Sequence, residues 1–329
     1  MKLKCPVTSE RSHVLKLEKD RSSCRLFAPE RRKSPIEEAD RKSDSLTADP
    51  ETIYILVLLI TGMVVGFACG LLGVGGGFLM VPVQIWALNS IGVEPTIATR
   101  VALGTSLAVI LPTALSGCHG HACRGVVLWR PGIALGVSGL LGAFLGGTIA
   151  AHAPADLLQR FFGLVVLFGA LRMLLYGSIA TKGSGLNGSE LKMIHPQYFV
   201  FGSVVGIVSG LSGIGGGVIL VPAMVVAMGF TMYQAVGTSS IAIAIISVGG
   251  ILSYAVNGLG VAGRPPYSLG YIDLFQWVLL AGSSIFTARA GVRVAHRIPA
   301  KGLTYIFIAV MLYVGLRMIG AYGWLHLSF

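Results

Sequence analysis

The chain has 329 residues, of which 54% are hydrophobic and only 12% are charged, a composition typical of an integral membrane protein rather than a soluble one. Its formal net charge is +11, and no acidic residue lies deep within an apolar run, so the membrane part is expected to hold no interior carboxylate. Because cation carriers and proton pumps usually bury Asp or Glu along their path, an anion or a neutral solute is the favoured substrate. The positive-inside rule also explains much of the basic excess.

Residues 1–52 are predicted to form a polar, disordered tail. The first 50 residues hold 12 Lys or Arg and 9 Asp or Glu, and they include few large apolar side chains. They lack the apolar core of a signal peptide, and their composition is typical of a segment that does not fold by itself.

Apolar runs fill most of the remaining chain, and about 20 apolar residues suffice for a membrane-spanning helix. The first half, 53–180, contains runs at 53–72, 78–88, 97–117, 131–151 and 157–176. A polar linker at 181–197 precedes the second half, 198–329, whose runs lie at 198–211, 218–228, 234–256, 274–290 and 303–322. We therefore predict an all-α, polytopic integral membrane protein with about 8–10 helical segments.

A glycine-rich phrase occurs once in each half. Residues 66–83 read GFACGLLGVGGGFLMVPV, residues 206–223 read GIVSGLSGIGGGVILVPA, and 9 of the 18 aligned positions are identical. Gly104-Thr105-Ser106 and Gly237-Thr238-Ser239 match in the same order, which predicts an internal duplication of two repeats. Because Gly costs about 1 kcal/mol and Pro about 3 kcal/mol in a helix interior, we predict a broken helix at each phrase.

Two broken hydrophobic segments at matching places point to the binding site of a transporter. Where a helix restarts after a break, its first N–H groups and its dipole can bind an anion without a charged side chain. We expect the anion to contact the backbone of Gly75, Gly76 and Gly77 and of Gly215, Gly216 and Gly217. The hydroxyls of Thr105, Ser106, Thr238 and Ser239 are the expected hydrogen-bond donors. Close helix packing through small residues and back-bonding of the hydroxyls are the alternatives.

Two other features suggest different roles. Arg100 lies near Thr105 and would either attract an anion or snorkel to the lipid headgroups, and we favour snorkelling. The run Cys118-His119-Gly120-His121-Ala122-Cys123 contains residue types that bind zinc or copper. Its spacing fits no standard finger, however, so we expect a loop and no metal site.

The sequence Gly210-Leu211-Ser212-Gly213 has the GxSG form of intramembrane serine proteases. Such an enzyme needs a histidine partner, for which His152 and His296 are the candidates. The first half has Leu72 where Ser212 stands, and a protease has no evident use for the duplicated glycines. We therefore predict that the protein is not an enzyme and keep the protease as an alternative.

The phrases at 70–82 and 210–222, together with Gly104-Thr105-Ser106-Leu107, resemble the TauE/SafE family of sulfite exporters. The resemblance covers roughly residues 53–322 and implies a multi-spanning carrier of sulfite, sulfoacetate or a related sulfur-containing organic anion. We expect a multi-pass transporter of the plasma membrane that works by alternating access, with a small anion and the lipid bilayer as its partners and with no cofactor and no nucleic acid. A channel or a carrier of neutral solutes is the alternative within transport. A homo-oligomer is kept as an alternative to a monomer.

Overall fold

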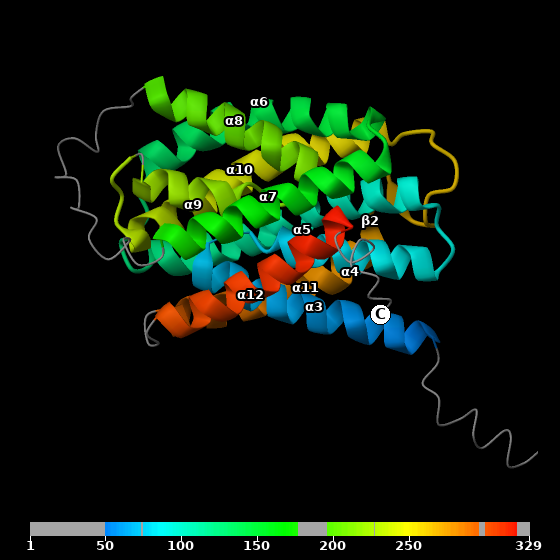
Figure 1. The fold of residues 1–329 in the computed structure, drawn as a ribbon, viewed down its shortest axis with the longest axis horizontal. Coiled ribbons are helices and arrows are strands. Elements are labelled where there is room, and N and C mark those ends of the chain that lie inside the picture. Colours follow the sequence, from blue (N-terminus) through cyan, green and yellow to red (C-terminus); the bar gives the residue numbers. More distant parts are fainter. Residues whose placement is uncertain (1–49, 74, 177–195, 227, 296–299, 321–329) are drawn as a thin grey trace, which may run out of the picture. The chain divides into compact units, whose positions relative to one another are not determined.

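The structure is a computed structural model that describes residues 50–73, 75–176, 196–226, 228–295 and 300–320. These residues are almost entirely helical (Figure 1). The helices are α3 (Pro50–Leu72), α4 (Gly77–Ser90), α5 (Pro95–Ala122), α6 (Trp129–His152), α7 (Ala155–Tyr176), α8 (Pro196–Ser212), α9 (Gly217–Val226), α10 (Met232–Asn257), α11 (Leu274–Ala295) and α12 (Ala300–Ile319). Each predicted run corresponds to one of these helices, so the all-α prediction is confirmed. The predicted tail and linker lie, apart from their last two or three residues, outside the described residues.

A short antiparallel pair of strands, β1 (Ser268–Leu269) and β2 (Ile272–Asp273), connects α10 to α11. No pattern in the sequence indicated this strand pair. Four described helices are long and apolar enough to cross a membrane, at Thr52–Leu71, Pro95–Ala122, Trp129–His152 and Tyr233–Asn257. Large apolar side chains such as Leu141, Val200 and Phe286 are more than half exposed, as expected where lipid rather than water covers the surface.

Glycine stripes let helices of the two halves approach closely. On α3, Gly62, Gly66 and Gly70 face α11, and on α8, Gly202, Gly206 and Gly210 face α6. A Cβ added at any of these six positions would overlap a backbone carbonyl of the facing helix. This is packing through small residues spaced four apart, and it joins α3 of the first half to α11 of the second, and α8 of the second half to α6 of the first.

Helices at matching places in the two halves run in opposite directions. The start of α5 lies beside the end of α6 and the start of α11, because Arg100 donates to the Ala153 carbonyl and Thr105 accepts from the Asp273 amide. The end of α5 lies beside the start of α10, because the amide of Leu128 donates to Thr238. Consequently α5 is antiparallel to α10, and α6 is antiparallel to α11.

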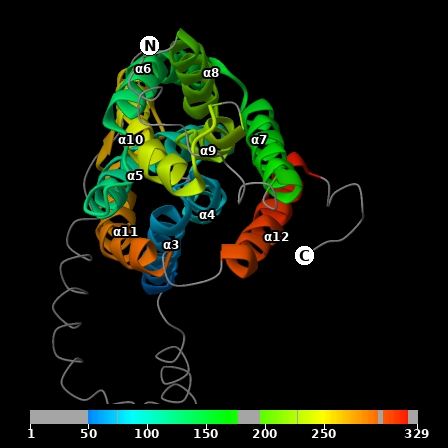
Figure 2. The same cartoon turned by 90° about the vertical axis from the view of Figure 1, so that its left-hand side faces the viewer.

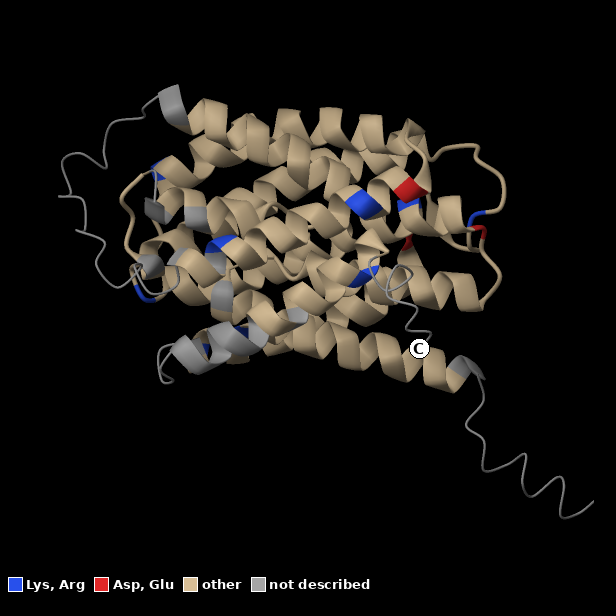
Figure 3. Cartoon of the chain, in the orientation of Figure 1, with Lys and Arg blue, Asp and Glu red and all other residues tan. Residues whose placement is uncertain are grey.

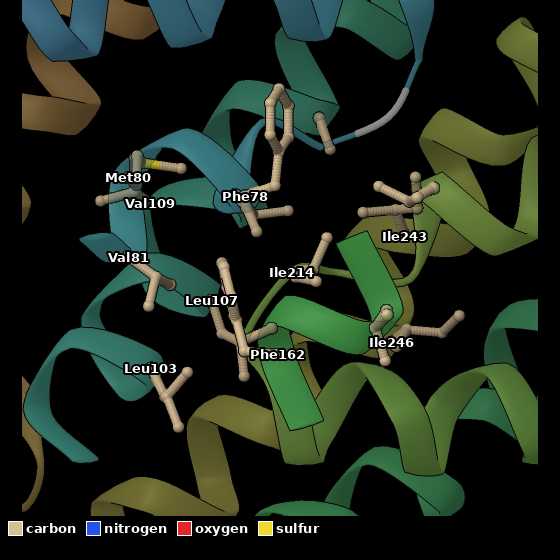
Figure 4. Close-up of a cluster of buried hydrophobic side chains, with 14 of the residues drawn as sticks. Phe78, Met80, Val81, Leu103, Leu107, Val109, Phe162, Ile214, Ile243 and Ile246 are labelled. Carbon is tan, nitrogen blue, oxygen red and sulfur yellow. The ribbon is translucent and has the colours of Figure 1, made fainter. Parts of the chain in front are cut away.

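The short helices α4 and α9 lie in the middle of the described helices. Figure 2 shows them between the pair α5–α10 and the pair α7–α12, and each contacts helices of both pairs. Buried side chains from several helices meet around them, among them Phe78, Leu107, Phe162, Ile214 and Ile243 (Figure 4). Both glycine-rich phrases therefore lie in the apolar interior of the protein.

Charged residues lie mostly toward the ends of the helices. In Figure 3 the acidic residues gather at the end where α5 begins, whereas basic residues occur at both ends. Three acidic residues have side chains that the structure describes. Glu94 directly precedes α5, Asp156 lies in the first turn of α7, and Asp273 directly precedes α11. The middle of the helices is left without charge, as a membrane requires.

Candidate functional site

The glycine-rich phrases break the helical path in the same way in both halves. Between α3 and α4, Gly73, Gly75 and Gly76 have φ angles of 65°, 85° and 70°. Between α8 and α9, Gly213, Gly215 and Gly216 have φ angles of 66°, 84° and 77°. Residues with a Cβ pay about 1–2 kcal/mol in this left-handed region, which explains why glycine stands at all six positions. The predicted helix breaks are confirmed.

The two breaks contact each other. A Cβ added at Gly77 would lie 2.7 Å from the carbonyl oxygen of Gly213 and 2.8 Å from the Cα of Ile214. Ile110 of α5 and Ile243 of α10 stand at matching positions and both lie against Gly75 and Gly215. Irregular backbone at membrane depth is tolerated only where protein covers it or where it lines a cavity, and here each break covers the other.

The breaks also present helix N-termini to the interior. Helix α4 starts after Gly76, an N-cap residue in the left-handed conformation with no side-chain capping bond, and no acidic residue occurs in its first turn. The first turn of α9 also lacks an acidic residue. The positive ends of both helix dipoles are therefore not neutralised by carboxylates of their own helices, which favours an anion.

The predicted serines contact the breaks in a crossed arrangement. The hydroxyl of Ser106 on α5 lies 2.7 Å from the carbonyl oxygen of Gly213 in the second break, and also bonds Leu103 of its own helix. The hydroxyl of Ser239 on α10 lies 3.1 Å from the carbonyl oxygen of Gly73 in the first break, and bonds Val236. Each half therefore holds the break of the other half through one buried serine.

The predicted threonines are used differently. Thr105 accepts a hydrogen bond from the amide of Asp273, just before α11, at 2.9 Å. Thr238 accepts one from the amide of Leu128, just before α6, at 3.0 Å. Both hydroxyls are fully buried. Their oxygens join α5 and α10 to the starts of neighbouring helices, and in this conformation they do not bond to the glycine-rich breaks.

The snorkelling interpretation of Arg100 is wrong. Its Nη1 lies 3.3 Å from the Tyr271 hydroxyl and its Nη2 lies 3.1 Å from the Ala153 carbonyl oxygen. The guanidinium carbon also lies 5.9 Å from the centre of the Tyr271 ring. The side chain is held by protein partners because the strand pair between α10 and α11, which the sequence did not reveal, folds over the start of α5.

One described acidic residue is buried in the protein, although it lies at the ends of the helices rather than at their middle. Asp273 is only 3% exposed, and its carboxylate accepts from the amides of Phe275 and Gln276 at the start of α11. Burial raises the pKa of this carboxyl, and the two amide bonds partly oppose the rise. The burial of Asp273 could not be predicted from the sequence, because the residue lies at the border of an apolar run rather than within it.

The run from Cys118 to Cys123 is not a loop. Residues up to Ala122 form the last turns of α5, and the Sγ of Cys123 lies 3.8 Å from the Nε2 of His119. Cys118 and His121 are buried, with His121 Nε2 3.2 Å from the carbonyl oxygen of Gly70, whereas Cys123 is exposed. Within the described part of the chain, no group of three or more His, Cys, Asp or Glu side chains is placed to hold a metal ion.

Among the described residues, Ser212 makes no hydrogen bond of the kind that activates a nucleophile. Its hydroxyl donates to the carbonyl of Val208 in its own helix at 2.7 Å, and the residue is fully buried. His152 is exposed and bonds the carbonyl of Thr148, and His296 lies outside the described residues. The GxSG pattern here belongs to the second break.

Two buried polar side chains near the breaks escaped the sequence analysis. Both amide atoms of Gln84, on α4, are buried without a hydrogen-bond partner, and so is the hydroxyl of Ser209, on α8. Ser209 lies next to the second break, because a Cβ added at Gly216 would be 3.4 Å from the Ser209 Cβ. Buried polar groups in proteins are nearly always paired. A lone glutamine inside the apolar run 78–88 was the available signal for Gln84.

Comparisons with known proteins agree with this description. The family model described as sulfite exporter TauE/SafE matches residues 58–318. A "probable membrane transporter protein" of Haemophilus influenzae is 29% identical over 266 residues, which is 80% of this chain and 98% of that protein. Proteins with the same description from Methanocaldococcus jannaschii and Xylella fastidiosa are 26% and 33% identical, over 81% and 63% of this chain and 96% and 77% of their own. No solved structure matches the chain significantly.

Proposed function

We propose that this chain, which belongs to the sulfite exporter TauE/SafE family and is a multi-pass membrane transporter, carries sulfite or a related sulfur-containing organic anion. The observation that carries this proposal is the contact between two glycine breaks in the apolar interior. Each break precedes a helix whose N-terminus lacks an acidic neighbour. Such a place favours an anion and offers a cation no carboxylate.

The substrate site consists of the backbone of Gly75, Gly76 and Gly77 together with Gly215, Gly216 and Gly217. In the described conformation Gly77 touches Gly213, so the breaks must separate before an anion can lie between them. Separation frees the hydroxyls of Ser106 and Ser239 from the Gly213 and Gly73 carbonyls, and those hydroxyls then donate to the anion. Thr105 and Thr238 are the remaining donors of the opened site.

The opposed directions of α5 and α10, and of α6 and α11, support alternating access as the mechanism. We assign residues 53–180 and 198–329 to two transmembrane repeats, joined by the linker 181–197 and preceded by the tail 1–52. When the repeats rock against each other, the site between the breaks opens first toward one end of the helices and then toward the other. The plasma membrane is the proposed location.

The test is uptake of radiolabelled sulfite into proteoliposomes that contain the purified protein, with protein-free liposomes as the control. Saturable uptake, reduced by unlabelled sulfoacetate, thiosulfate or sulfate more than by chloride, is the expected result. A carrier saturates, whereas flux through a channel follows the membrane voltage and rises with concentration. Absence of flux for every anion tested, with folded protein, would contradict the proposal and favour a neutral solute.

A further inference from the structure

Arg100 carries a charge that none of its described partners neutralises. It belongs to the segment Pro95–Ala122, which is long and apolar enough to cross a membrane, yet the groups that bond it are the hydroxyl of Tyr271 and the carbonyl of Ala153. The aromatic face of Tyr271 adds a weak attraction for the cation. All of these partners are neutral, and the Nε of Arg100 is buried with no hydrogen-bond partner.

A guanidinium in this state is poised to bind an anion. It has five N–H donors, of which the two bonds described use two. Charged groups within membrane proteins are costly, and those that occur are paired or mark the path of a substrate or ion. Asp273 does not act as a counter-ion in the described part of the chain, since it forms no ion pair with Arg100 and its Oδ1 accepts from the first amides of α11.

The position of Arg100 connects it with the second break. Ser106, which contacts Gly213, follows six residues later on α5, about 9 Å along the helix at 1.5 Å per residue. Gly104 lies between them, and a Cβ there would be 2.5 Å from the Tyr271 carbonyl oxygen. The segment that holds Arg100 therefore also covers the stretch of α5 that leads to the break.

We infer that Arg100 binds the transported oxyanion at the end where α5 begins, before the anion reaches the paired breaks. The inference rests on the proposed function and names a further residue of its route. A planar guanidinium matches two oxygens of one anion, so Arg100 favours an oxyanion over a halide. The matching position in the second half is Tyr233, a neutral residue, so this binding step belongs to one end of the carrier.

The experiment compares sulfite uptake and its inhibition by chloride in proteoliposomes of the wild type, Arg100→Gln, Arg100→Lys and Arg124→Gln. Arg124 is the matched control, because it lies just beyond the other end of α5, is exposed, and also donates to a backbone carbonyl, that of Val292. Arg100→Gln is expected to raise the KM for sulfite by about tenfold or more, since a charge-assisted hydrogen bond is lost. Arg124→Gln is expected to leave that KM within about twofold of the wild type.

Arg100→Lys keeps the charge and loses the planar fork, so the KM for sulfite should rise while inhibition by chloride stays unchanged. If gel filtration shows that Arg100→Gln does not fold, the KM of Arg100→Lys tests the inference in its place. A purely structural role would lower the melting temperature without changing the KM. An unchanged KM in both Arg100 variants, or an equal rise in Arg124→Gln, would overturn the inference and leave the proposed function standing. Failure of the wild type to transport any anion would contradict both this inference and the proposed function.

Discussion

Gly77→Ala is expected to lower sulfite uptake by about tenfold or more, because overpacking of an interior typically costs about 1–3 kcal/mol. The new Cβ would stand 2.7 Å from the carbonyl oxygen of Gly213 and 2.8 Å from the Cα of Ile214. Both of these atoms are backbone, which cannot move aside as a side chain does. Gly77 has an ordinary φ angle, and alanine is the better helix former. The change is therefore opposed by steric overlap with the second break and by the closeness of Ile110 Cδ1, 3.1 Å from the new Cβ.

Two matched variants separate this contact from other effects of losing a glycine. Gly282→Ala, on α11, places a Cβ where nothing lies within 4 Å, and Gly92→Ala does the same at a φ of 84°. Gly282→Ala introduces neither backbone strain nor steric overlap, whereas Gly92→Ala introduces backbone strain alone. Uptake close to the wild type in both, beside a large loss in Gly77→Ala, is the expected pattern. Equal losses in all three would show that the breaks have no special part in transport.

Replacing both crossed serines is expected to have the second large effect. Ser106→Ala and Ser239→Ala each remove the hydroxyl that donates a hydrogen bond to a buried carbonyl in the break of the other half. A buried polar group left without its partner costs about 1–3 kcal/mol, so the double variant should lose most of its uptake. If the two hydroxyls also donate to the anion in the opened site, the KM for sulfite will rise in each single variant.

Ser247→Ala is the control for the serine variants. Ser247 lies on α10, as Ser239 does, and is fully buried, but its hydroxyl bonds only carbonyls of its own helix, those of Ile243 and Ala244. Its replacement should change uptake by less than about twofold, because back-bonding within a helix contributes little to stability. Uptake in the double serine variant that matches this control would contradict the role of the crossed serines.

The sequence predicted the helices well because the signal for each is local. Every apolar run became a helix, and the glycine triplets fell at breaks because only glycine adopts the left-handed backbone required there. What the sequence lacked was information on which segments meet. The contacts of Ser106 with Gly213 and of Ser239 with Gly73 join residues more than 100 positions apart, and no spacing rule reveals such pairs.

The errors share one physical origin, which is tertiary packing that overrides a local expectation. Arg100 resembled an interfacial arginine until the strand pair before α11 covered it. The polar run that ends at Cys123 resembled a loop, yet α5 continues to Ala122, where His121 is buried near Gly70 of α3.

The central claim, that the transported anion binds the backbone of both breaks, is tested most directly by hydrogen–deuterium exchange of the protein in nanodiscs with and without sulfite. An anion held by amide N–H groups slows the exchange of those groups. We expect slower exchange in peptides covering residues 73–80 and 213–220 when sulfite is present, and no such change with an equal concentration of chloride. Unchanged exchange in both peptides, at a sulfite concentration that saturates uptake, would contradict the claim.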